Sequence, residues 1–337
     1  MNNNYSYIHL FIFLQKIKNY EVGIYEKIKS YLIYKFKSSQ ELEDAVDSYT
    51  CKETMEYAFN KYYLISLWDT SLITNMNSLF ENKENFNENI ELWDVSNVED
   101  MAEMFYNCKN FNQPLNRWDI SNVKYMVEMF FSCENFNQPL DRWDISNVID
   151  MNSMFFGCEN FNQSLNNWDT SQVKKLRYMF YGCKKFNQPL NEWDVSNVID
   201  MNSLFHDCEK FNQPLNSWDT SQVKKLNYIF WSCKNFNQPL NNWNISKCEE
   251  LVGLFLYCKK FNQNLNDWDV SNIKKMTCLF SGCIIFNQPL DKWNVSNVKK
   301  MDSMLEDCHQ FNQNLNNWDI SLVDDISEMF SECINFN

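Results

Sequence analysis

The chain of 337 residues is 45% hydrophobic and 16% aromatic, and its five glycines and six prolines exclude a disordered or linker-rich composition. Its formal net charge of −14 argues against binding to nucleic acid, because an acidic surface repels phosphates. No stretch approaches the roughly 20 apolar residues that cross a bilayer, so no membrane span is predicted.

Residues 1–38 are the first predicted unit, a basic and aromatic segment that does not repeat. It holds six lysines and two glutamates, a charge of +4, which leaves −18 on the rest of the chain. Ile24, Ile28 and Leu32 are spaced as one face of a helix. Residues 24–32 also faintly resemble the helix of an F-box, which would make the chain an adaptor with the remainder as its receptor.

Residues 39–63 are predicted to form a helical cap. Ser38 with Glu41, and Thr50 with Glu53, match the capping-box pattern that opens a helix. Helical spacing turns six side chains inward: Leu42, Val46, Tyr49, Met55, Phe59 and Tyr62. Such a terminal unit would cover the apolar face of the first repeat that follows.

Residues 64–337 contain about eleven repeats of 25 residues. Tryptophan falls at 68, 93, 118, 143, 168, 193, 218, 243, 268, 293 and 318. A fixed period of this length is typical of a solenoid, in which each coil stacks on its neighbours. A longer period of 50 residues is superimposed, since residues 149–153 return as residues 199–203.

Each repeat is predicted to contain a short strand and a helix. Trp118 and Ile120 alternate with Asp119, as in a strand with one buried face. The apolar positions from Val123 to Cys133 keep helical spacing. The sequence therefore predicts an α/β solenoid, a curved stack of strand-helix coils with an N-terminal helical cap.

The repeat resembles the short, 25-residue version of the BspA-type leucine-rich-repeat family of surface proteins, best known from mycoplasma lipoproteins. The resemblance is carried by Trp-Asp-Val-Ser-Asn-Val at 193–198, Met-Phe-x-x-Cys at 179–183 and Phe-Asn-Gln-Pro-Leu-Asn at 186–191. It covers roughly residues 64–337. It implies a leucine-rich-repeat-like solenoid that binds proteins or surfaces and has no known catalysis.

Ten of the thirteen cysteines, from Cys108 to Cys333, recur at the same step of 25 residues. Neighbours in such a row are a whole coil apart, about 4.8 Å or more, whereas a disulfide needs Cβ atoms about 3.8 Å apart. A straight row also cannot surround a zinc ion. We interpret these residues as buried free thiols, which favours an intracellular, reducing location over the cell surface or secretion.

Three further rows recur along the array. An aromatic row is the first binding candidate, because it ends in polar residues and so suggests a position near solvent; it comprises Tyr106, Phe131, Phe156, Tyr181, His206 and Trp231. An acidic strip is the second candidate, and includes Asp119, Asp144, Asp169, Asp194 and Asp219. Asn244 and Asn294 interrupt the acidic strip, which favours an Asx-turn to the backbone two residues on. A row of asparagines, such as Asn137, is interpreted as a structural amide ladder.

The sequence contains no phosphate loop, HExxH or GxSxG motif, and its three histidines share no recurring partner. We therefore predict a non-enzymatic repeat protein that needs no cofactor or metal and serves as a scaffold for a protein partner. A structural surface or particle component and the F-box-like adaptor remain alternatives.

Overall fold

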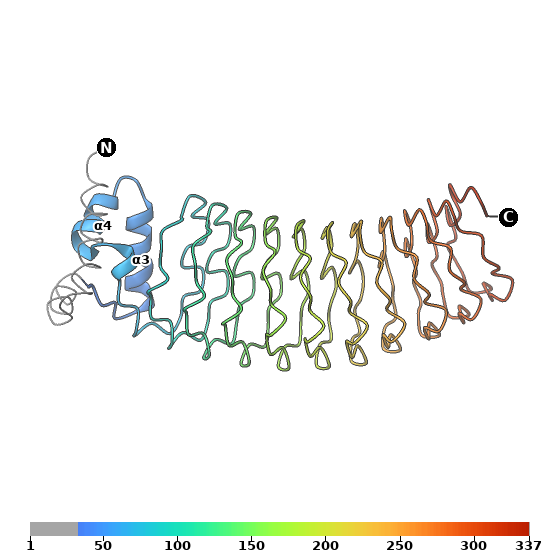
Figure 1. Cartoon of the computed structure of the whole chain (residues 1–337), viewed down its shortest axis with the longest axis horizontal. Coiled ribbons are helices and arrows are strands. Elements are labelled where there is room, and N and C mark those ends of the chain that lie inside the picture. The colour runs from blue at the N-terminus through green and yellow to red at the C-terminus, as the bar shows by residue number, and fades with distance from the viewer. Residues whose placement is uncertain (1–32, 337) are drawn as a thin grey trace.

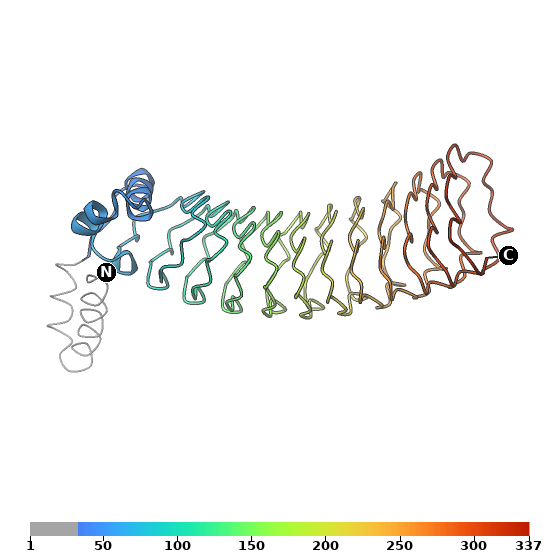
Figure 2. The same cartoon turned by 90° about the horizontal axis from the view of Figure 1, so that it is seen from above.

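Successive repeats wind into coils that stack in a long row, and the helices of the described residues lie at its N-terminal end (Figures 1 and 2). The structure is a computed structural model and describes residues 33–336. Helix α3 spans Ser39–Thr50, helix α4 spans Met55–Tyr62, and the short 3-10 helix η1 spans Ile65–Leu67. The prediction for Ile24, Ile28 and Leu32, and the F-box-like resemblance, lie outside the described residues.

Backbone hydrogen bonds between coils hold the row together. In the coil around Phe130, every second N–H donates to a carbonyl of the following coil. The bonds run from Met126 to Asp150, Glu128 to Asn152, Phe130 to Met154 and Ser132 to Phe156, at 3.2, 2.9, 2.9 and 2.6 Å. Glu128 and Ser132 adopt positive φ of 56° and 55°, which turns alternate peptide groups along the row. The pairing between coils therefore consists of isolated parallel bridges, such as that between Tyr125 and Asp150.

The predicted α/β solenoid of strand-helix coils is wrong. Within residues 33–336 there is no β-strand, and the only α-helices, α3 and α4, precede the array. The leucine-rich-repeat-like architecture implied by the resemblance is corrected with it. The curvature was expected because strands pack closer together than helices do, and this reason fails because the array within residues 33–336 contains neither a β-strand nor an α-helix.

Tight turns, rather than a helix, explain the spacing between Val123 and Cys133. The N–H of Met129 donates to Met126, and the N–H of Cys133 donates to Phe130, each three residues back. Such turns return a side chain to the core every three or four residues, as a helix would. The apolar side chains are buried as predicted, but their N–H groups serve turns and neighbouring coils.

The predicted strand at Trp118 fails for a similar reason. Trp118 and Ile120 are buried and Asp119 is exposed, so the alternation of burial is confirmed. The N–H of Trp118, however, donates to Leu115 in its own coil. No ladder to a neighbouring coil forms here.

The core is a set of aromatic columns that run the length of the array. Phe130 stacks on Phe155 with ring centroids 5.6 Å apart, and Trp143 stacks on Trp168 at 6.5 Å. All four rings are at most 4% exposed. Because each ring contacts its counterparts in the coils on either side, the array has one continuous core.

Helix α3 covers the first coil of the array (Figure 1). The Ser38 hydroxyl accepts from the N–H of Glu41, so this predicted cap is confirmed. The predicted cap at Thr50 is wrong, because the Thr50 hydroxyl donates to Val46 within α3 and Thr54 precedes α4. Met55, expected inside, is 47% exposed.

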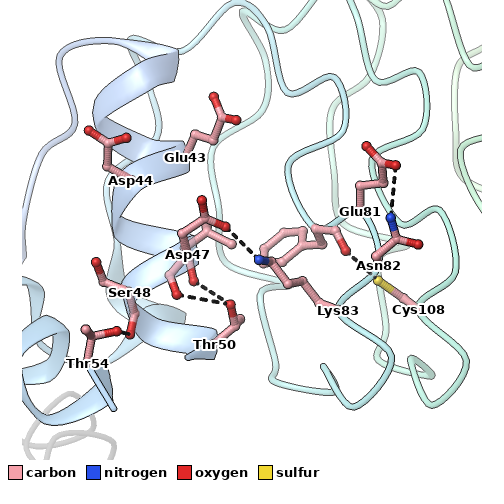
Figure 3. Close-up of polar contacts among 12 residues, drawn as sticks. Glu43, Asp44, Asp47, Ser48, Thr50, Thr54, Glu81, Asn82, Lys83 and Cys108 are labelled. Atoms are coloured by element: carbon pink, nitrogen blue, oxygen red, sulfur yellow. Dashed lines mark hydrogen bonds and ion pairs between the residues drawn. The ribbon is translucent and has the colours of Figure 1, made fainter. Parts of the chain in front are cut away.

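Lys83 links the first coil to α3. Its Nζ lies 2.6 Å from Asp47 Oδ1, as Figure 3 shows. Lys83 stands where later repeats carry a buried cysteine, such as Cys108. A lysine suits this place because the neighbour is a helix with an acidic face instead of another coil.

None of the helices among residues 33–336 has the length and apolar character needed to cross a membrane.

Candidate functional site

The predicted aromatic row is a continuous ladder of rings, stacked at every step except between Tyr181 and His206, whose planes are tilted by 50°. Centroid distances between successive rings are 4.6, 4.3, 4.3, 4.2 and 4.1 Å, along Tyr106, Phe131, Phe156, Tyr181, His206 and Trp231. These six residues are the aromatic ladder. All but His206 are half-buried, so the rings face one another and leave their edges to solvent.

His206 is the buried rung of the aromatic ladder, at 6% exposure. Its Nε2 lies 3.7 Å from Asp207 Oδ2. Burial lowers the pKa of His206 to about 4, and the nearby carboxylate only partly opposes this. The imidazole is therefore neutral at pH 7 and packs as a ring between Tyr181 and Trp231.

The residues that follow Trp231 in the row confirm a position near solvent only in part, since Glu306 and Ser331 are half-buried but Leu256 and Ser281 are buried. Leu256 is 9% exposed and Ser281 is 2% exposed. The Ser281 hydroxyl lies 3.3 Å from Glu306 Oε2, in the next coil, which satisfies its polar group. A polar residue is therefore accommodated at Ser281 because its hydroxyl hydrogen-bonds to the next coil.

The acidic strip forms the predicted Asx-turns. Asp144 Oδ1 accepts from the N–H of Ser146 at 3.0 Å, and Asn244 Oδ1 accepts from Ser246 in the same way. The other members of the strip, Asp119, Asp169, Asp194 and Asp219, make the equivalent bond at 2.9–3.2 Å. The hydrogen bonds from Ser146 lower the pKa of Asp144. The carboxylates are exposed, so the strip stays available as a second surface.

The asparagine row is the predicted structural amide ladder. Asn137 Oδ1 accepts from the N–H of Asn162 in the next coil at 2.9 Å, and also from Gln163 Nε2 at 3.0 Å. The same pattern continues through the neighbouring coils. These amides are used between coils, which removes them as candidates for binding.

The cysteine row is buried and consists of free thiols, as predicted. Each Sγ donates to a phenylalanine or leucine carbonyl 28 residues earlier; Cys158 does so to Phe130 at 3.0 Å. Burial raises the pKa of Cys108 to about 12. Such thiols are poor nucleophiles and act as small core residues with a weak donor.

Ion pairs between coils were not predicted from the sequence. Lys175 lies 3.5 Å from Asp150, and Lys225 lies 3.4 Å from Asp200. The 50-residue period was the available signal. If every coil had the same sequence, identical charges would lie side by side along the row. Because the sequence alternates between coils, a lysine in one coil lies beside a carboxylate in the next.

The sequence relationship of the chain agrees with this tandem organisation. The family model described as "Mycoplasma protein of unknown function, DUF285" matches residues 50–168, 149–268 and 239–337. The chain belongs to this family. Within the DUF285 array, the three overlapping matches run from α3 to the last coil. Among curated proteins, none is significantly similar in sequence.

Proposed function

We propose that the chain is a non-catalytic scaffold that binds a protein partner through the aromatic ladder. The observation that carries the proposal is the continuous row of six rings in contact along six successive coils, in which every neighbouring pair is stacked except the tilted pair of Tyr181 and His206. Stacked rings are rigid, so a partner that contacts their edges orders few side chains. Aromatic residues are also enriched where proteins meet.

The use of the recurring polar groups supports a binding role. Asp144, Asn137 and Cys158 each represent a row that hydrogen-bonds to its own turn or to a neighbouring coil. The side chains of the ladder change from coil to coil, from tyrosine and phenylalanine to histidine and tryptophan. A repeat protein gains specificity in this way, because an invariant frame presents a variable face.

Two further observations support the setting. The short BspA-type repeat, which this sequence resembles, implies attachment to proteins or surfaces. The buried reduced thiols support a reducing, intracellular location, since disulfides are rare there.

The test compares two triple variants. Phe131→Ser, Tyr181→Ser and Trp231→Ser remove three rings, whereas the Leu variant at the same positions keeps apolar volume without aromaticity. Serine and leucine both occur in this row, at Ser281 and Leu256. Partners captured by the native chain are quantified with each variant, and thermal unfolding reports folding.

The proposal expects both folded variants to lose the partner. Unfolding of the Leu variant as well as the Ser variant would show that the aromatic ladder is core, and unchanged capture by either folded variant would equally reject the site. If replacement of Asp144, Asp169 and Asp194 by Asn alone removes the partner, binding belongs to the acidic strip.

A further inference from the structure

Positive charge is concentrated beside one part of the aromatic ladder, although the chain as a whole carries −14. Two adjacent positions follow each buried cysteine. In four successive coils these eight positions contain six lysines, one glutamate and one asparagine, which gives a net charge of +5. We call the lysines the basic corner: Lys184, Lys185, Lys210, Lys234, Lys259 and Lys260. In the two coils before it, these positions hold Glu134 and Glu159 with asparagines.

The backbone places the basic corner directly beside the aromatic ladder. After Tyr181 the chain turns through Gly182 and buried Cys183, and the N–H of Lys184 donates back to Gly182 at 2.8 Å. Lys234 makes the same bond to Ser232, three residues after Trp231. Three residues span at most about 10 Å, so each lysine emerges near the ring of its own coil.

Asp207 shows that the two surfaces meet. Its carboxylate faces His206 at 3.7 Å. Burial and then the Asp207 charge raise the pKa of Tyr181. A hydrogen bond to Glu159 is the main cause of the raised pKa of Lys184, to which Asp207 also contributes. One carboxylate thus acts on rungs of the ladder and on a lysine of the basic corner.

All six lysines of the basic corner are exposed and so can meet a partner. Lys184 and Lys234 pair with Glu159 and Glu209 of the preceding coils and remain 48% and 47% exposed. Lys185 donates to Asn160 Oδ1 at 2.6 Å. It and the remaining three lysines are exposed and have no carboxylate within ion-pair distance among residues 33–336.

The aromatic surface widens in the same coils. Tyr178 packs edge-on against Tyr181, with centroids 6.1 Å apart, and Tyr228 lies 5.4 Å from Trp231. Tyr257 is 44% exposed beside Lys259. Among residues 33–336, no such second ring flanks Phe131. The basic corner and the widest aromatic area therefore coincide.

We infer that the basic corner and the adjoining rungs bind a short, extended acidic peptide whose carboxylates meet the lysines and whose apolar side chains meet the rings. The inference rests on the proposed function and specifies the partner. Four coils at roughly 5 Å spacing extend about 15 Å, which matches about five residues of extended chain. A longer polyanion such as nucleic acid would continue onto Glu134 and Glu159, whose charge repels it.

The test uses a fluorescein-labelled octapeptide in which aspartate alternates with phenylalanine. Lys184→Gln, Lys234→Gln and Lys259→Gln together lower the net charge of these positions from +5 to +2. The control combines Lys124→Gln, Lys274→Gln and Lys292→Gln, which are exposed, ion-paired lysines elsewhere on the array. Fluorescence anisotropy measures binding by the full chain, with an octapeptide of lysine and phenylalanine and with octathymidylate as competing probes.

We expect the first variant to bind the acidic peptide about tenfold or more weakly than the native chain, and the control variant to lose less than about twofold in affinity. The affinity of the native chain should fall as the salt concentration is raised. Equal effects of the two variants, or equal binding of the basic peptide, would overturn the inference. Tighter binding of octathymidylate would show that the occupant is a nucleic acid. A natural partner that requires the ladder rings but ignores the lysine variant would refute the acidic peptide and leave the scaffold intact.

Discussion

The indole Nε1 of Trp193 donates to the backbone carbonyl of Leu165, 28 residues earlier, at 2.8 Å. Every tryptophan of the 25-residue series from Trp93 to Trp318 makes the equivalent bond, and Trp231, which belongs to the aromatic ladder, stands outside that series. Trp68 differs, because its buried Nε1 has no hydrogen-bond partner within residues 33–336. The cap helices stand where a preceding coil would supply the carbonyl, and Trp68 packs instead against aromatic rings such as Tyr49.

Phenylalanine at these two positions should therefore have unequal effects. Trp193→Phe removes the indole donor from the Leu165 carbonyl, which then accepts only from the N–H of Trp168, a loss of about 0.5–1.5 kcal/mol. Trp68→Phe removes an N–H that is already unpaired, so the free energy of unfolding should fall less. Urea denaturation of both variants measures the difference. Equal losses would mean that the hydrogen bond is not what the indole contributes.

Removal of the whole ring should uncouple the array locally. Trp193→Ala deletes a side chain that stacks on Trp168 and Trp218, at a cost of about 3–5 kcal/mol. Since each coil contacts only its neighbours, we expect an early partial unfolding step, followed by melting of the flanking coils. Calorimetry that shows one undiminished cooperative transition would contradict this expectation.

The thiols should be protected by the fold. Cys158 and Cys183 are fully buried, whereas Cys51 is exposed, so a thiol reagent should label Cys51 at once and the cysteine row only in denaturant. Reducing and non-reducing gels should show no difference in mobility. Rapid labelling of the row in the native chain would refute this.

Alkaline pH tests the same burial independently. Burial raises the pKa of the row in the folded state, so folded thiols keep protons that unfolded thiols lose. The stability from this source is complete below the unfolded thiol pKa of about 8.5 and decreases as pH rises beyond it. Urea unfolding followed from pH 7 to 10 gives the slope, and a flat profile would be inconsistent with a buried row.

For the core of the repeats, the sequence predicted correctly which residues are buried, but it did not predict the backbone conformation of those residues. Trp118, Val123 and Cys133 are core residues, as their spacing indicated. That spacing could not separate a helix from a series of tight turns, because both return side chains inward every three or four residues. The positive φ of Glu128 and Ser132 distinguishes them, and neither residue type announces that conformation.

The candidate sites were predictable to different degrees. The 25-residue period places Tyr181 and Trp231 at the same position of the repeat, so the sequence predicted that their rings belong to one row. The meeting of that row with Lys184 was not predicted, because it depends on the turn at Gly182. The ion pair of Lys175 with Asp150 required knowledge of which side chains face each other across coils.

The acidic strip should tolerate amides. Asp144→Asn keeps an oxygen that accepts from Ser146, as Asn244 does from Ser246, so the free energy of unfolding should change little. Asp144→Ala loses the acceptor and should cost about 1 kcal/mol. Urea denaturation compares the two. Equal destabilisation by both substitutions would show that the negative charge, not the Asx-turn, matters here.

Mild acid should destabilise the array through His206. Its folded pKa is about 4 against an ordinary value of 6.5, so between these values the unfolded chain binds more protons. Stability is therefore complete above about pH 6.5 and decreases as pH falls toward 4, by up to about 3 kcal/mol. His206→Phe keeps a ring between Tyr181 and Trp231 and should flatten this part of the profile. His309→Phe removes an imidazole outside the aromatic ladder and is the control. An acid-induced loss that persists in His206→Phe would assign the pH dependence to the carboxylates and separate it from the ladder.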